Sequence, residues 1–220
     1  MTHRLVALVN EKGGSGKTTL AVNLAGALAS SGLQVVLADA DPQQSATRWL
    51  AQRQDAAPFA VVQVRMGRDA ARFGADLAVA SRRHDADVLL VDLPPGLPAA
   101  AEAALLLADL ALVPVTPSPL DLWAAEKAVQ LIADARKQRG GRQPVGALVP
   151  FRVIPGTVLG REMGAALADF ALAVAPSISQ RVAFAESAIV GKTLPEYEPT
   201  NPAVDELRHL AAFVARRIRG

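Results

Sequence analysis

The chain has 220 residues, of which 51% are hydrophobic and 20% are charged, so it can bury a large core. It contains no cysteine, which excludes disulfides, thiolate metal centres, iron–sulfur clusters and cysteine nucleophiles. The formal net charge of +2 does not by itself indicate nucleic-acid binding, although the pI of about 9.3 leaves that class open. We find no signal-peptide pattern and no apolar run approaching ~20 residues, so the sequence predicts a cytoplasmic protein.

Strand and helix patterns alternate along the whole chain. Runs rich in branched apolar residues predict strands at residues 4–9, 34–38, 60–64, 87–91, 110–115, 145–150 and 173–176. Helical spacing predicts helices from residue 17 to 31, at 44–52, up to about 83, and at 99–108, 119–139, 156–170, 181–189 and 202–219. This alternation predicts one α/β domain over residues 1–220, with a mostly parallel twisted sheet flanked by helices on both faces. Ligands of such sheets bind at the carboxyl ends of the strands.

A glycine-rich loop follows the first predicted strand. Residues 11–19 read Glu-Lys-Gly-Gly-Ser-Gly-Lys-Thr-Thr and form a shifted version of the phosphate-loop pattern. Such a loop wraps a polyphosphate with inward-pointing N–H groups, and the following helix adds its positive dipole end. Lys17 is expected to reach the β- and γ-phosphates, and the Thr18 hydroxyl to ligate Mg²⁺. The expected nucleotide contacts are Gly13, Gly14, Ser15, Gly16, Lys17, Thr18 and Thr19. A chance glycine-rich turn is the plainer alternative, but a strand precedes this loop and a helix follows it. A second lysine, Lys12, is not needed for binding the phosphates.

Three aspartates fall at the carboxyl ends of predicted strands. Asp92 follows four apolar residues, which is typical of a Walker B aspartate that holds Mg²⁺, in part through water. Asp39 and Asp41 follow the second strand, where one would support the metal shell and the other would orient a water on the γ-phosphate. A plainer alternative is that Asp41 caps the next helix, with Pro42 at its first position.

Three segments together resemble the ParA/MinD family of deviant Walker A ATPases. They are Lys-Gly-Gly-Ser-Gly-Lys-Thr at 12–18, Asp-Ala-Asp-Pro-Gln at 39–43 and Val-Asp-Leu-Pro-Pro at 91–95. Residues 115–121 and 178–181 resemble the short, ParF-like partition ATPases. The resemblance implies a P-loop NTPase that uses ATP and Mg²⁺, in which two protomers sandwich the nucleotides. It implies that Lys12 crosses to the partner's phosphates, that Lys17 serves its own nucleotide and that Asp41 positions the hydrolytic water. The expected catalytic residues are therefore Lys12, Lys17 and Asp41, and the expected metal-site residues are Thr18, Asp39 and Asp92.

The same resemblance implies a working cycle. The ATP-bound homodimer binds non-specific DNA on the nucleoid, and a ParB-like or other adaptor protein stimulates hydrolysis while a cargo is positioned. The candidate DNA contacts are Arg181, Arg216, Arg217 and Arg219, although relatives' key arginine is replaced by Ala183. Residues 136–142 form a second basic cluster, and Arg152 is the candidate for contact with the adenine. Nothing in the sequence identifies the cargo.

A membrane-cycling, MinD-like regulator is the alternative function. The last predicted helix carries an apolar stripe and basic residues beside it, as a membrane-surface helix does. We expect packing against the domain instead, so that a membrane partner is not predicted. The stripe consists of Leu207, Leu210, Ala211, Val214 and Ile218. A metabolic ligase on the same scaffold is disfavoured by Lys12, and an iron-protein-type cluster carrier is excluded by the absence of cysteine.

Overall fold

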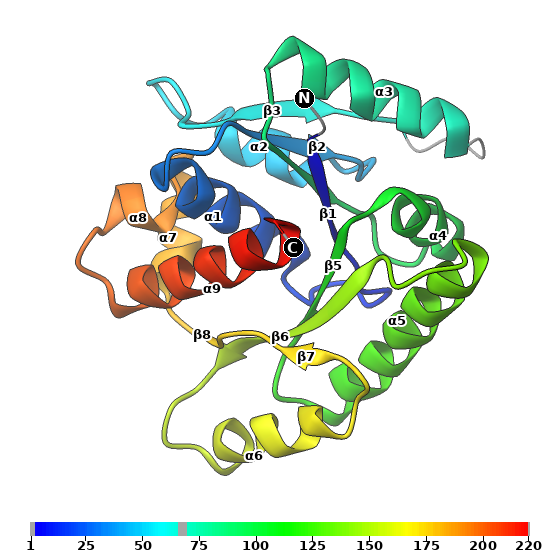
Figure 1. Ribbon diagram of the computed structural model, residues 1–220. Helices are drawn as coiled ribbons and strands as arrows, with labels where there is room; N and C mark the ends of the chain where they lie inside the picture. Colours follow the sequence, from blue (N-terminus) through cyan, green and yellow to red (C-terminus); the bar gives the residue numbers. More distant parts are fainter. Residues whose placement is uncertain (1–2, 66–69, 220) are drawn as a thin grey trace.

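A single sheet of parallel strands runs through the computed structural model, which describes residues 3–65 and 70–219 (Figure 1). The spatial order is β3-β2-β4-β1-β5-β6-β7, with β8 paired to the far part of β6. Every pairing between the described strands is parallel. The strands are β1 (Arg4–Leu8), β2 (Val35–Asp39), β3 (Ala60–Gln63), β4 (Val88–Asp92), β5 (Leu110–Val115), β6 (Val145–Val153), β7 (Ala173–Val174) and β8 (Ile178–Ser179).

Helices cover both faces of this sheet. The helices are α1 (Lys17–Ser30), α2 (Ser45–Leu50), α3 (Ala70–Arg83), α4 (Pro98–Leu107), α5 (Pro119–Gln138), α6 (Val158–Ala168), α7 (Ala183–Ile189), α8 (Leu194–Tyr197) and α9 (Pro202–Arg219). In Figure 1, α1 and α9 lie side by side on one face, and α4 and α5 lie on the other. The predicted α/β class with a mostly parallel sheet is therefore confirmed.

The core is divided by the sheet into two halves. Val6 and Leu8 of β1 face the half that contains α1 and α9, while Leu5, Ala7 and Val9 face the half under α3, α4 and α5. Alternate residues of a strand point to opposite faces, so a strand covered on both sides must be apolar throughout. Full burial of each Leu or Val side chain stabilises the fold by about 1.5–3 kcal/mol. Packing on both faces therefore holds the sheet in place, and with it the carboxyl ends of the strands, where ligands of this fold class bind.

The boundaries agree with the predicted ones to within a few residues, with two omissions. Strand β8 and helix α8 were not predicted, because two residues and a single turn carry too little periodicity. The predicted strand at 173–176 is only two residues long. The prediction of one domain over 1–220 includes residues 1–2, 66–69 and 220, which lie outside the described residues.

The C-terminal helix packs against the domain, as expected. The five residues of its apolar stripe, Leu207, Leu210, Ala211, Val214 and Ile218, are buried in the core half that contains α1. Within residues 3–65 and 70–219, no helix is both long enough and apolar enough to cross a bilayer.

Candidate functional site

The loop between β1 and α1 is shaped by glycines at positive φ. Gly14 has φ of 77° and Gly16 has φ of 87°, values that side-chain-bearing residues rarely adopt. A Cβ atom at Gly16 would lie 2.2 Å from a ring carbon of Phe151, so the ring of β6 supports the loop from below. The loop conformation thus depends on the lack of a side chain at Gly16 and on the buried aromatic ring beneath it.

The loop encloses a cavity at the carboxyl ends of the strands. Its lining includes every predicted nucleotide contact in the loop, from Gly13 to Thr19, together with Asp41 and Arg152. The Ser15 hydroxyl is buried without a hydrogen-bond partner among the described residues. A buried polar group without a partner is uncommon, and a phosphate oxygen would satisfy it.

Lys17 is held inside this loop. Its Nζ donates hydrogen bonds to the carbonyl oxygens of Asn10 at 2.7 Å and Lys12 at 3.3 Å. Burial lowers the pKa of Lys17, while the nearby carboxylates of Asp92 and Asp41 act in the opposite direction. A nucleotide phosphate would therefore replace carbonyl partners with a full negative charge, which favours the charged form of the lysine.

Asn10 is a functional-site residue that the sequence analysis missed. Its side-chain amide donates to the carbonyl of Pro114 at 2.9 Å, and its side-chain oxygen accepts the N–H of Lys12 at 2.9 Å. It thereby ties the start of the loop to β5. A polar residue at the end of an apolar strand was the only signal that pointed to it.

Thr18 and Asp92 form a pair that fits a divalent cation. The Thr18 hydroxyl donates to Oδ2 of Asp92 at 2.6 Å, and the other carboxylate oxygen of Asp92 is buried with no partner in the part of the chain that is described. Burial raises the pKa of Asp92 to about 7. A hard cation would supply the missing partner and restore the charged carboxylate.

The rest of such a coordination shell would come from the ligand and water. Among the described residues, no group of three or more His, Asp or Glu side chains could hold a metal ion. Mg²⁺ in nucleotide sites keeps several waters and takes oxygens from phosphates, so one carboxylate and one hydroxyl suit it.

Asp39 has structural partners in this chain. Its carboxylate accepts hydrogen bonds from the N–H of Thr47 at 2.9 Å, from the Thr47 hydroxyl at 2.8 Å and from the N–H of Asp41 at 3.2 Å. These contacts hold α2 against the end of β2. The predicted place of Asp39 in the metal shell is not supported by these bonds and stays a prediction.

Asp41 lines the phosphate cavity and does not cap α2. The residue before α2 is Gln44, so the interpretation of Asp41 as the helix cap with Pro42 at the first position is wrong. Oδ1 of Asp41 accepts the N–H of Gln43 at 2.8 Å, which closes a tight turn. This turn holds the carboxylate at the wall of the cavity.

Lys12 is paired within its own chain. Its Nζ lies 2.6 Å from Oδ2 of Asp121 in the first turn of α5; the lysine side chain is 36% exposed and the aspartate 4%. The N-terminal end of a helix stabilises a carboxylate, so Asp121 is well placed to hold a cation there. The neighbouring Glu11 pairs with a different lysine: its Oε2 lies 3.8 Å from Nζ of Lys127. Contact of Lys12 with a partner's phosphates, as predicted, requires the pair with Asp121 to open.

A second cavity continues from the phosphate cavity. The two share Thr19, Trp49 and Arg152, and the second adds Arg181 and Phe184. Arg152 donates to the carbonyl of Gly14 at 3.2 Å, and its guanidinium lies 5.7 Å from the centre of the Phe151 ring. Nε of Arg181 is buried and has no partner within the described ranges. Arg181 therefore lines the cavity next to the phosphate cavity and is half-buried.

The remaining candidate DNA contacts lie on α9. Arg216, Arg217 and Arg219 are exposed, and the Arg217 guanidinium lies 4.8 Å from the centre of the Phe213 ring. The second basic cluster is partly structural, because Arg136 donates to the carbonyl of Pro144 and Arg139 to that of Ala108.

The chain is similar to known nucleotide-binding proteins over most of its length. Residues 6–194 match the model of the CobQ/CobB/MinD/ParA nucleotide binding domain. The chromosome-partitioning ATPase Soj of Thermus thermophilus is 32% identical, with 98% of this chain and 97% of that protein covered. The maintenance of carboxysome distribution protein A of Halothiobacillus neapolitanus is 34% identical over 84% of this chain and 83% of that protein.

Solved structures share the fold. The septum site-determining protein MinD of Pyrococcus horikoshii, solved with Mg-ADP, superposes with a TM-score of 0.76 at 19% identity and covers 97% of this chain and 96% of that one. The phosphate loop, the buried Asp92 and these matches lead to one conclusion. The chain belongs to the CobQ/CobB/MinD/ParA nucleotide-binding family and, within it, to the ParA/Soj-type P-loop ATPases.

Proposed function

We propose that the chain is a Mg²⁺-dependent ATPase that forms a homodimer around two ATP molecules and, as the dimer, binds non-specific DNA to position a cargo. The observation that carries the proposal is a second lysine at the mouth of a complete phosphate loop. The side chain of Lys12 makes no hydrogen bond or ion pair within the loop in the described part of the chain; it is 36% exposed and is paired with the buried Asp121 of α5. A lysine in this position is suited to placing its positive charge against the phosphates bound by the partner protomer.

The residues that line the phosphate cavity have different roles in binding and hydrolysing ATP. Thr18 and Asp92 hold Mg²⁺ when it is bound, and the ion neutralises charge on the phosphates. Lys17 exchanges its carbonyl partners for phosphate oxygens, and the N–H groups of the loop and of α1 surround them. Asp41 orients the attacking water from the cavity wall. The Mg-ADP in the Pyrococcus protein of the same fold supports a magnesium-bound nucleotide as the ligand.

The adenosine part of the nucleotide would occupy the second cavity. Arg152 and Arg181 line this cavity together with the aromatic residues Trp49 and Phe184. Because Nε of Arg181 is buried without a partner in the described chain, a ribose or base acceptor would satisfy it. We therefore assign Arg181 to the nucleotide in preference to DNA.

Exposed apolar side chains beside Lys12 support the dimer. Leu120 is 59% exposed and Trp123 is 60% exposed in the first turns of α5, and Leu159 at the start of α6 is also exposed. Leu159 lines a hollow that also contains Lys12, Asp121 and Arg152. Each such side chain would gain up to about 1.5–3 kcal/mol when a partner buries it fully. Apolar area around a charged centre is typical of an interface.

DNA binding is proposed for α9. Arg216, Arg217 and Arg219 are exposed in its last turn, and a dimer doubles the number of phosphate contacts. The names of the relatives, a chromosome-partitioning ATPase and a carboxysome distribution protein, support transport over the nucleoid with an adaptor that stimulates hydrolysis. The apolar face of α9 is buried against the core, so we propose no membrane partner.

The proposal is tested by retention of the protein on plain duplex DNA. We expect retention that requires ATP and Mg²⁺, weakens with salt and is abolished in Lys12→Ala. Lys127→Ala is the matched control, because it removes an exposed lysine whose nearest acidic group is Glu11. Retention without nucleotide, or equal retention of the Lys12→Ala protein, would contradict the proposed function.

A further inference from the structure

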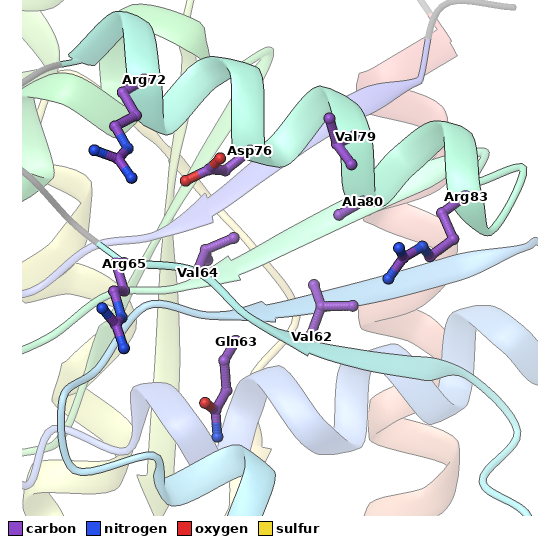
Figure 2. Close-up of a pocket in the computed structure, with 9 residues that line it drawn as sticks. All are labelled: Val62, Gln63, Val64, Arg65, Arg72, Asp76, Val79, Ala80 and Arg83. Atoms are coloured by element: carbon purple, nitrogen blue, oxygen red, sulfur yellow. The ribbon is translucent and has the colours of Figure 1, made fainter.

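A groove lies between the edge strand β3 and helix α3, apart from the nucleotide site (Figure 2). Val62, Val64 and Arg65 line it on the strand side, and Val79, Ala80 and Arg83 line it on the helix side. We call it the β3–α3 groove; its cavity volume is about 600 Å³. No residue that lines it lines the phosphate cavity or the cavity next to it.

The strand side of this groove carries an unpaired edge. Strand β3 pairs only with β2 among the described strands. The N–H of Val64 donates to the carbonyl of Asp39 in β2, so the backbone groups of Val62 and Val64 point toward β2. Since successive residues of a strand point their backbone groups to alternate sides, those of Val61 and Gln63 face outward. A free edge with outward N–H and C=O groups can accept a further strand.

The groove also offers apolar surface, mainly from Val62 and Val79, because Val64 is largely buried in the core. Figure 2 shows Val62 and Val64 pointing toward α3, while Gln63 points away from it. Val79 on α3 is 51% exposed and forms the opposite wall. An added strand presents every second side chain to the same face, so its apolar side chains would fit between these valines.

Positive charge lies at both ends of the groove. Arg65 and Arg72 lie at one end and Arg83 at the other, and Asp76 is the one acidic residue among the described residues of the lining (Figure 2). Arg65 and Arg83 are exposed and have no ion pair within residues 3–65 and 70–219. In the described part of the lining, Arg65 and Arg83 offer two cationic groups, which fits an anionic ligand.

The free strand edge, the apolar side chains and the arginines together favour one class of partner. A second copy of this chain would bring arginine against arginine at the same edge, which disfavours homotypic pairing. Duplex DNA would meet the arginines but gain nothing from the strand edge or the valines. An extended polypeptide that alternates acidic and apolar residues uses all three features.

We propose that the β3–α3 groove binds an extended acidic segment of a partner protein by strand addition to β3. The backbone of the segment pairs with Val61 and Gln63, and its carboxylates lie near Arg65 and Arg83. The groove is present in the nucleotide-free chain, so the binding needs neither ATP nor the dimer. Its failure would therefore leave the proposed ATPase cycle untouched.

The experiment measures the fluorescence anisotropy of a labelled Glu-Val-Glu-Val-Glu-Val-Glu peptide, without nucleotide. Gln63→Pro removes an outward N–H without breaking a bond to β2, a place where edge strands tolerate proline. Gln63→Ala is the matched control, because it keeps the N–H. We expect about tenfold weaker binding for Gln63→Pro and less than a twofold change for Gln63→Ala.

A second variant tests the charges without touching the backbone. Arg65→Glu combined with Arg83→Glu is expected to weaken binding of the acidic peptide at least tenfold, and a Lys-Val peptide of equal length should not bind the unmodified chain. Several results would overturn the proposal. They are no binding of the acidic peptide, equal binding by all variants, equal binding of the lysine peptide, or a charge effect on labelled duplex DNA alone. The last result would assign the arginines to DNA, and the others would leave them only a role in protecting the strand edge from aggregation.

Discussion

The phosphate loop makes a quantitative prediction about Gly16. Replacement by alanine places a Cβ at 2.2 Å and 2.5 Å from two ring carbons of Phe151, at a residue whose φ is 87°. The left-handed backbone costs a side-chain-bearing residue about 1–2 kcal/mol, and overpacking a filled core costs about 1–3 kcal/mol. Because Phe151 is 1% exposed and packs against Phe184, a shift of its ring would disturb that packing. We expect Gly16→Ala to lower the free energy of unfolding by about 2–5 kcal/mol.

Gly14→Ala separates the two causes. Gly14 has φ of 77°, but nothing lies within 4 Å of a Cβ built there, so only the backbone cost of about 1–2 kcal/mol applies. The assay is urea unfolding of the nucleotide-free protein, so that loss of ligand binding does not enter the comparison. We expect the midpoint of Gly16→Ala to lie below that of Gly14→Ala at an unchanged slope.

A double variant then identifies the partner of the clash. Phe151→Leu shortens the ring and should recover part of the stability that Gly16→Ala loses, giving a coupling of about 1 kcal/mol or more. Equal losses in the two alanine variants, or strict additivity of Gly16→Ala with Phe151→Leu, would refute the role of Phe151 as the support of the loop.

Three further predictions concern the aspartates. Burial raises the pKa of Asp92 from 3.8 to about 7, so the folded state keeps a proton that the unfolded chain releases. The free energy of unfolding of the nucleotide-free protein is therefore expected to fall as the pH rises from about 4 to 7. Urea unfolding at pH 5 and pH 8 should show about 3 kcal/mol of this loss, because about two pH units of the titration range lie between them, and Asp92→Asn should abolish it; an unchanged pH dependence would contradict the buried carboxyl. Asp121→Ala frees Lys12 and should promote the ATP dimer about fivefold at limiting ATP in size-exclusion chromatography, whereas weaker dimerisation would show that the pair assists assembly. Asp39→Ala should destabilise the protein by about 2–4 kcal/mol and Thr47→Val by about 1 kcal/mol in chemical denaturation, and equal small effects would argue against the contacts that hold α2.

Local features of the site were predictable from the sequence. The phosphate loop, Thr18 and Asp92 could be predicted because each belongs to a short sequence pattern that follows an apolar strand. The α/β class follows from the alternation of two periodicities, and burial of the α9 stripe follows from its spacing. In each case a local pattern determines the local structure.

Features that depend on distant residues were not predictable. Lys12 and Asp121 are 109 positions apart in the sequence, and only the order of β1 and β5 in the sheet brings them together. The same is true of Asn10 with Pro114 and of Arg181 with the second cavity. The interpretation of Asp41 as a helix cap failed because its carboxylate closes a turn before Gln44, so that α2 begins at Ser45, three residues later than Pro42 at the first helical position requires.

The central claim is that two copies of the chain assemble around ATP with Lys12 supplied across the interface. Sedimentation velocity of Asp41→Ala with ATP and Mg²⁺, alone and combined with Lys12→Ala, tests it most directly. We expect a dimer for Asp41→Ala, because nucleotide binds but hydrolysis is slowed, and a monomer for the double variant. A monomeric Asp41→Ala protein at saturating ATP, or a dimeric double variant, would contradict it.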